Sequence, residues 1–154
     1  MPGKKIKLLY LDSNNQSQTR FKNKFGKNYT IYVVKNESEA IELLDRKTIH
    51  IIVSALTVNG SSGLKSLKSL VEKHPEPKRI IISEEIVLGE VIEAVNKTHI
   101  YAYISFKWQH ERIEKILDKA FLEFNKELEE RAYNFRLQKT NEQLEFMLRE
   151  KLVS

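Results

Sequence analysis

Five short apolar runs, each followed by an amphipathic segment, constrain the fold of this chain more than any other feature of its sequence. The runs are rich in β-branched residues and cover 6–11, 29–34, 50–56, 79–83 and 100–105. The residues between them repeat apolar side chains at helical spacing. Strands that alternate with helices pair in parallel through right-handed crossovers, and the helices cover both faces of the sheet. We therefore predict an α/β fold with a doubly wound, five-stranded parallel sheet.

The segments between the runs contain signals that start and stop helices. Asn36 precedes Glu37 and Glu39 at the spacing of a capped helix start, and Gly26 follows the first amphipathic segment. The signals predict helices over 16–25, 36–44, 64–73 and 84–96. In the last of these helices, the expected inward residues are Val87, Val91, Ile92 and Val95, with Glu84 and Glu85 in the first turn beside the positive end of the helix dipole.

Composition excludes several classes of protein. The chain has no cysteine and four scattered histidines, so we expect neither a disulfide framework nor a metalloenzyme. No apolar run approaches the roughly 20 residues of a membrane helix, and no signal peptide is evident, so we expect a cytoplasmic protein without membrane contact. The net charge of +5 comes from 26 basic and 21 acidic residues that are mixed along the chain. Nucleic-acid binding therefore stays an alternative and not the main expectation.

Small or polar residues follow the runs at their carboxyl ends. They are Leu11-Asp12-Ser13-Asn14, Ile52-Val53-Ser54-Ala55-Leu56 with Asn59-Gly60-Ser61-Ser62-Gly63-Leu64, Ser83, and Tyr103-Ile104-Ser105-Phe106-Lys107-Trp108. In this order and spacing, residues 4–120 resemble the receiver domain of bacterial two-component response regulators. The resemblance implies a flavodoxin-like sheet with strand order 2-1-3-4-5. It also implies a site at the carboxyl edge, where the family transfers a phosphoryl group from histidine to an aspartate with the help of magnesium and a lysine.

The residues at this site depart from the family pattern. The resemblance places Ala55 at the phosphoacceptor position, where a methyl group offers no nucleophile. Asp12 is the residual member of the acidic pair, because Ser13 stands where the second carboxylate belongs, and Phe106 stands at the vacant lysine position. We therefore expect a degenerate site with no catalytic residue, no metal and no cofactor.

Two residues next to these positions are candidate substitutes for the missing groups, but neither is expected to face the site. Ser54 should face a packed layer, because side chains alternate along a strand. Lys107 follows Phe106 where the family has proline, and a lysine one position late also faces elsewhere. Because a cis bond before a residue other than proline costs about 2.5–4 kcal/mol, we predict a trans peptide between Phe106 and Lys107.

Ser83 and Tyr103 occupy the positions of the switch residues that the family resemblance implies. A simpler interpretation is that Ser83 caps the following helix and that Tyr103 packs in the core. Another alternative is that a carboxylate of Glu84 or Glu85 imitates the missing phosphate. Of these hypotheses, the cap and the packing role are preferred.

The segment 109–151 contains no proline or glycine and predicts one long helix. A first apolar stripe includes Phe121, Phe124, Leu128 and Phe135, and a second includes Leu137, Leu144 and Leu148, followed by Lys151 or Leu152. The change of phase between 131 and 141 predicts a stutter or a local break. We expect a parallel or antiparallel coiled coil that forms a homodimer, with a helix that folds back or frays beyond Leu128 as the alternative.

These expectations define two parts of the chain. Residues 4–122 form the receiver-like domain, and residues 123–154 form a helical extension that is either a coiled coil or a linker to an output domain. The predicted function is a non-enzymatic signalling module that binds protein partners independently of phosphorylation. The alternatives are a working phosphorelay receiver with a displaced acceptor such as Asp12, and a basic nucleic-acid-binding regulator.

Overall fold

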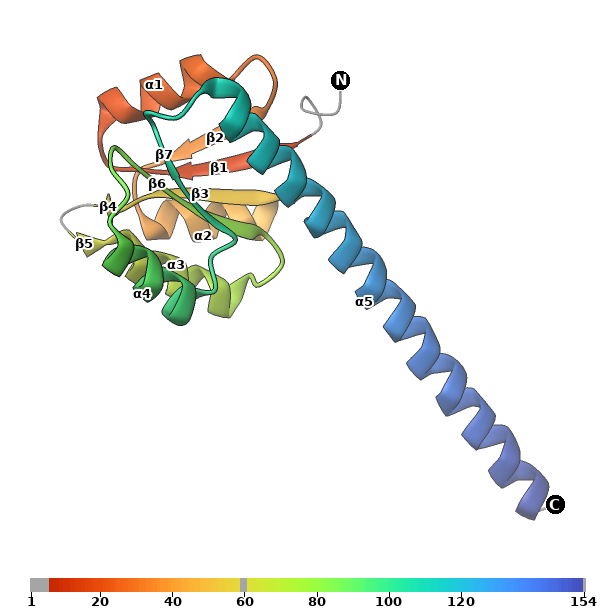
Figure 1. Ribbon diagram of the computed structural model, residues 1–154. Coiled ribbons are helices and arrows are strands. Elements are labelled where there is room, and N and C mark those ends of the chain that lie inside the picture. Colours follow the sequence, from red (N-terminus) through yellow and green to blue (C-terminus); the bar gives the residue numbers. More distant parts are fainter. Residues whose placement is uncertain (1–5, 59–60, 154) are drawn as a thin grey trace.

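The computed structural model describes residues 6–58 and 61–153, and its centre is a five-stranded parallel sheet (Figure 1). The strands are β1 (Lys7–Leu11), β2 (Thr30–Val34), β3 (Ile51–Ala55), β6 (Lys78–Ser83) and β7 (Ala102–Ser105). Their order is β2-β1-β3-β6-β7, with all four neighbouring pairs parallel. The predicted doubly wound sheet and its strand order 2-1-3-4-5 are therefore confirmed.

Two layers of helices bury the sheet. One face contacts α1 (Asn15–Phe25) and the first part of α5 (His110–Val153), and the other contacts α2 (Glu37–Arg46), α3 (Gly63–Lys73) and α4 (Leu88–Thr98). The strand residues alternate between two apolar clusters, one on each face, because successive side chains point to opposite sides. This sandwich leaves the carboxyl edge of the sheet as the open side.

The strand register brings the predicted site positions to that edge. Leu11 pairs with Ser54, Ala55 pairs with Ile82, and Ser83 pairs with Ser105. The residues that follow β1, β3, β6 and β7 therefore meet at one end of the sheet.

Short polar residues start the helices that frame this edge. The side chain of Asn14 accepts from the Ser17 amide at 3.0 Å, and that of Asn36 accepts from the Glu39 amide at 2.9 Å. At the start of α3, a β-carbon on Gly63 would lie 2.0 Å from the carbonyl oxygen of Ala55. The close approach of α3 to the end of β3 therefore requires glycine at this position.

A small hairpin follows β3 where the sequence predicted only a loop. It consists of β4 (Thr57–Val58) and β5 (Ser61–Ser62), which pair antiparallel. Asn59-Gly60 separates the two strands and lies outside the described residues, but this dipeptide favours tight hairpin turns and was the signal for the hairpin in the sequence.

The prediction for α4 was wrong in its start and in most of its inner face, since only Val91 of the four expected inward residues packs against the core. The helix begins at Leu88, not at Glu84, and its N-cap residue Val87 makes no side-chain capping bond. Ala94 is fully buried, whereas Val87, Ile92 and Val95 are about half exposed. The small Ala94 side chain lets α4 pack closely against the core, and the larger apolar residues remain on the surface.

The carboxyl-terminal helix α5 is continuous over its 44 residues, which corresponds to about 66 Å of helix. Its first turns cover the sheet, and the remainder runs straight away from the domain (Figure 1). The predicted local break is therefore wrong, as is the alternative that the helix folds back, because all residues from 128 to 152 are exposed. Within the described residues, no helix is long and apolar enough to cross a membrane.

Candidate functional site

Asp12 lies at the open edge of the sheet just after β1, but its carboxylate is buried and hydrogen-bonded on both oxygens. Its side chain accepts a hydrogen bond from the Tyr10 hydroxyl at 2.7 Å and another from the Asn14 amide at 2.9 Å, one on each oxygen. Asp12 is only 4% exposed, and its backbone carbonyl accepts from the side-chain amide of Gln18. The one remaining acid of the predicted pair is thus a structural group of the loop.

Tyr10 is a site residue that the sequence analysis missed. Its ring stacks on Phe21 at a centroid distance of 4.2 Å, which directs the hydroxyl toward Asp12. Burial raises the pKa of Tyr10 far above its usual value, and the hydrogen bond to Asp12 raises it further, so the hydroxyl stays a donor. The signal in the sequence was the spacing, because residues i and i+2 of a strand lie on the same face.

The end of β3 offers no reactive group. Ala55 terminates the strand, and the preceding Ser54 is fully buried with its hydroxyl donating to the Ala55 carbonyl at 2.9 Å. An ideal β-carbon at Gly63 would be 3.1 Å from the Ser54 hydroxyl oxygen, so this side chain lies beneath the start of α3. The prediction that Ser54 faces a packed layer is confirmed.

Phe106 fills the position that the resemblance gives to a lysine. Its ring is 6% exposed, and the guanidinium of Arg20 lies 4.3 Å from the ring centroid. Arg20 also forms an ion pair with Glu84, which bridges α1 and the loop after β6. A cation–π contact and an ion pair therefore cover this side of the edge, and Arg20 is a second residue that the sequence analysis missed.

Lys107 does not replace the missing lysine. Its ammonium pairs with the Glu85 carboxylate at 3.2 Å on the exposed rim. The described chain contains no cis peptide bond, so the predicted trans geometry between Phe106 and Lys107 is confirmed. Glu84 and Glu85 precede the first turn of α4, so their predicted role at the helix dipole is wrong, and both instead form ion pairs with cations of neighbouring elements.

Ser83 is the last residue of β6, and Tyr103 lies next to it in the neighbouring strand β7. The Ser83 oxygen is 3.4 Å from the Tyr103 hydroxyl, and the Ser83 hydroxyl donates to the Glu85 carbonyl at 2.6 Å. Tyr103 is buried and donates to a carboxylate oxygen of Glu90 in α4 at 3.2 Å. The predicted capping role of Ser83 is wrong, because α4 starts only at Leu88, with Val87 as its N-cap residue. The two residues instead connect the edge of the sheet to α4.

The residues at this edge do not fit the magnesium ion that the fold family implies. Hard divalent cations require several oxygen ligands, yet Ser13 and Ala55 supply no charge and both Asp12 oxygens already accept hydrogen bonds. Among the described residues, no group of three or more acidic or histidine side chains is arranged to hold a metal.

The predicted partner residues of α5 fall into two groups. Phe121 and Phe124 pack on their own domain, with ring centroids 4.8 Å and 5.0 Å from that of His50. Leu128 lies at the border of the domain and Phe135 lies beyond it, and both are at least half exposed. Leu128 also borders a hollow of about 360 Å³ between α5 and the ends of α2 and α3.

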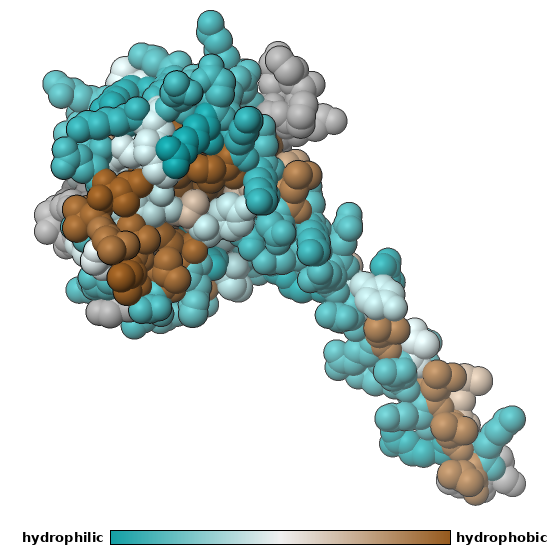
Figure 2. Space-filling model, in the orientation of Figure 1, coloured by the Kyte–Doolittle hydropathy of each residue, from teal (hydrophilic) through white to brown (hydrophobic). Residues whose placement is uncertain are grey.

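An exposed apolar surface covers α4 and the turn before it. Figure 2 shows it as a large hydrophobic area on the globular part of the molecule. Its residues, which we call the α4 patch, are Ile86, Val87, Leu88, Ile92 and Val95. Contiguous exposed apolar side chains of this kind mark surfaces that bind other molecules.

Comparisons with known proteins agree with this architecture. No protein-family model matches the chain. Its sequence is similar to the hydrogenase transcriptional regulatory protein HoxA of Bradyrhizobium diazoefficiens, with 27% identity over 113 residues that cover 73% of this chain and 23% of that protein. The HoxA protein of Cupriavidus necator is 30% identical over 108 residues, which cover 70% of this chain and 22% of that protein. The chain thus spans less than a quarter of the length of these curated relatives.

Solved structures resemble the chain more extensively. A signal receiver domain of an HD domain-containing protein from Pseudomonas fluorescens has a TM-score of 0.74 and 22% identity, over 82% of this chain and 93% of that one. A CheY-like receiver domain protein from Methanospirillum hungatei has a TM-score of 0.69 and 15% identity, over 79% and 98%. The beryllofluoride-activated NtrC4 receiver domain dimer has a TM-score of 0.67 and 18% identity, over 77% and 98%. Together with the strand order and the layered helices, these likenesses identify the globular part of the chain as a domain with the fold of response regulator receivers.

Proposed function

We propose that this protein is a receiver-type signalling module that acts by contact with other proteins and does not accept phosphate. The observation that supports this most strongly is the carboxyl edge of the sheet, where Ala55 ends β3 and the Asp12 carboxylate is committed to Tyr10 and Asn14. Phosphoryl transfer to a carboxylate requires a nucleophile with access to the donor and a cation that neutralises charge. Neither requirement is met by the side chains at this edge.

Asp12 is also a poor candidate for a displaced acceptor. An attack by Asp12 would have to use an oxygen that already accepts a hydrogen bond from Tyr10 or Asn14, in a side chain that is almost closed to solvent. Arg20, whose charge acts on the neighbouring Tyr10, is already paired with Glu84. A working phosphorelay receiver is therefore the second hypothesis and not the first.

The surfaces that favour a binding role are the α4 patch and the part of α5 beyond Phe124. A complex is stabilised by about 25 cal/mol for each Å² of exposed apolar surface that the partner removes from water. Two similar proteins are named transcriptional regulators, and one similar structure is a receiver dimer. We propose a homodimer that forms through α5 and a further protein partner at the α4 patch, with residues 123–154 as a helical extension of the domain.

The absence of phosphotransfer can be tested by mass. The purified chain is incubated with acetyl phosphate and magnesium, beside a receiver domain with an intact aspartate as positive control, and both are measured as intact proteins. We expect no adduct on this chain under conditions that label the control. A stoichiometric adduct that hydroxylamine removes would overturn the proposal, and its loss in Asp12→Asn would identify the displaced acceptor.

Dimerisation is tested by sedimentation of the full chain and of a version that ends at Phe124. We expect a dimer for the first and a monomer for the second, because the shorter version keeps the packing of Phe121 and Phe124 on the domain. A monomer in both cases would contradict the proposed dimer. DNA affinity that falls steeply with salt would favour the nucleic-acid-binding alternative instead.

A further inference from the structure

We infer that the distal half of α5 pairs with the same segment of a second copy of the chain, parallel and in register, and that Asn134 and Asn141 determine this arrangement. The inference rests on the proposed dimer and specifies its geometry. It concerns only residues beyond the globular domain, where α5 is helical and exposed.

Five residues form a narrow stripe along this part of the helix. They follow one another at spacings of three and four, which is the repeat of a two-stranded coiled coil. We call them the seam: Asn134, Leu137, Asn141, Leu144 and Leu148. The three leucines are 44%, 53% and 62% exposed, so the single chain leaves the apolar part of the seam in water.

The seam lies on a different face of α5 from the residues that pack on the sheet. Leu117, Ala120 and Phe124 are buried against the domain. At 3.6 residues per turn, the seam is rotated from this buried face by about a third of a turn. The change of phase within the unbroken helix therefore has a structural consequence: a partner helix can cover the seam without displacing α5 from its own domain.

The two asparagines favour a parallel pairing with a second copy of the chain over other pairings of the helix. In the heptad repeat, Asn134, Asn141 and Leu148 take the a positions, and Leu137 and Leu144 take the d positions. In a parallel, in-register dimer, each a residue meets its own counterpart, so the two Asn141 amides can donate to and accept from each other. In the same arrangement, each seam leucine packs against the same leucine of the second copy.

An antiparallel dimer pairs a positions with d positions. Asn141 would then lie against Leu144 of the second copy, and its amide would have no hydrogen-bond partner in the seam. The same conflict excludes a partner helix with a purely apolar stripe. An asparagine at an a position pairs best with an asparagine at the facing a position of the partner helix. A second copy of this chain supplies that residue, so the seam fits a second copy best.

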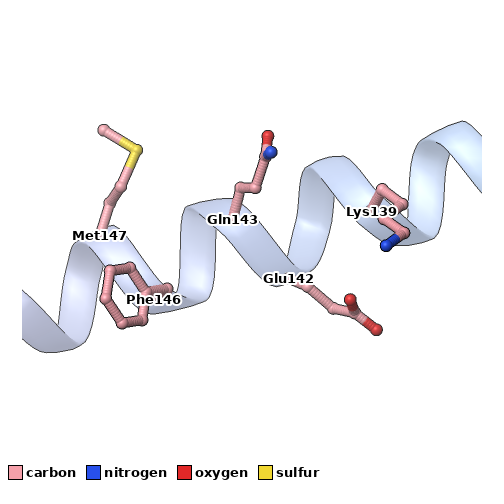
Figure 3. A pocket seen from close by; sticks show the side chains of 5 residues that line it. All are labelled: Lys139, Glu142, Gln143, Phe146 and Met147. Carbon is pink, nitrogen blue, oxygen red and sulfur yellow. The ribbon is translucent and has the colours of Figure 1, made fainter.

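The other faces of this segment provide control positions. A shallow hollow of about 420 Å³ runs along the helix and is lined by Lys139, Glu142, Gln143, Phe146 and Met147 (Figure 3). All five residues come from one helix, and none belongs to the seam. Gln143 projects from α5 away from the leucines of the seam and is the matched control for substitutions at Asn141 and Leu137.

Single cysteines test the orientation, because the full chain contains none of its own. Leu137→Cys, Leu148→Cys and Gln143→Cys are oxidised separately, and Leu137→Cys is also refolded with a differently tagged Leu148→Cys. In the parallel dimer, each seam cysteine meets its counterpart, whereas positions 137 and 148 are about 16 Å apart along the axis, too far for a disulfide. We expect most of each seam variant to form self-linked dimers, at least fivefold more than Gln143→Cys, and no mixed 137–148 product.

Other outcomes separate the inference from the proposed dimer. A mixed product without self-linked dimers overturns the parallel arrangement while the dimer stands. A dimer by light scattering without any seam product means that another surface pairs, which also overturns the inference. A monomer contradicts both. As a second variant, Asn141→Leu removes the polar pair. We expect the mixed 137–148 product to appear in that background and not in Gln143→Leu. Its absence from both would refute the role of Asn141.

Discussion

The hydrogen bond from Tyr10 to Asp12 has a stability effect that can be measured against an internal control. In Tyr10→Phe, the ring keeps its stacking on Phe21, but the buried carboxylate of Asp12 loses the donor that lies 2.7 Å away. A hydrogen bond to a charged group contributes about 1.5–3 kcal/mol, and a buried acceptor left unpaired also loses solvation. For a chain of 154 residues, this corresponds to a fall in Tm of roughly 3–12 °C.

Tyr29 supplies the control because its hydroxyl donates to the Asp118 carboxylate at 2.8 Å, almost the same length. Asp118 is exposed, so water can replace the tyrosine hydroxyl. We expect Tyr29→Phe to cost about 0–1 kcal/mol, as for other exposed charged contacts. The Tyr29 hydroxyl also lies 3.3 Å from the Glu114 carbonyl, so the two variants compare a buried carboxylate acceptor with an exposed one and do not isolate burial alone.

Urea denaturation of Tyr10→Phe, Asp12→Ala and the double variant completes a thermodynamic cycle. We expect a coupling free energy of at least about 1 kcal/mol between Tyr10 and Asp12. If Tyr10→Phe costs no more than Tyr29→Phe, or if the coupling is below about 0.5 kcal/mol, Asp12 is not held as described and its exclusion as an acceptor loses its main support.

Three further predictions follow from the same structure. Ala55→Asp should gain no stoichiometric adduct from acetyl phosphate in intact-mass spectra, because it restores neither the second acid nor the lysine. Gly63→Ala should cost more than about 2 kcal/mol in urea denaturation, since its β-carbon would lie 2.0 Å from a carbonyl oxygen, whereas Gly89→Ala in open space should be neutral or stabilising. Burial lowers the pKa of His50, so the folded protein loses stability as the pH falls below about 6.5, where the unfolded chain takes up a proton more readily. In thermal melts, the Tm of His50→Asn should therefore fall less between about pH 7.5 and 5.5 than the Tm of the unchanged protein.

The fold was predictable because its signals are local. The β-branched runs, the caps at Asn14 and Asn36, and the glycine at 63 each act within a few residues, and together they allow few topologies for a chain of this length. The start of α4 was not predictable in this way. Ser105 donates to the Glu84 carbonyl at 2.7 Å, and Ser83 donates to the Glu85 carbonyl. A tertiary contact and a local turn contact therefore hold these two residues outside the helix.

The positions that depart from the family pattern could be named from the resemblance, but the contacts that surround them could not. Arg20 and Phe106 are 86 positions apart, and only the packing of α1 against the end of β7 brings them together. Tyr10 had a local signal in its spacing from Asp12, yet its interaction depends on the ring of Phe21, which holds the hydroxyl in place. Sequence patterns thus indicate which groups are missing more readily than which contacts take their place.

The proposed function also limits how such a domain can be regulated. A ligand shifts an equilibrium between two conformations only by its difference in affinity for them, and phosphate provides no such difference where it does not bind. Tyr103 donates to Glu90 on α4, and α4 presents the apolar α4 patch. A partner that covers this patch therefore acts on the same helix that contacts Tyr103. We infer that the free energy for any conformational change in this protein comes from association at α4 and along α5, and not from chemistry at the edge of the sheet.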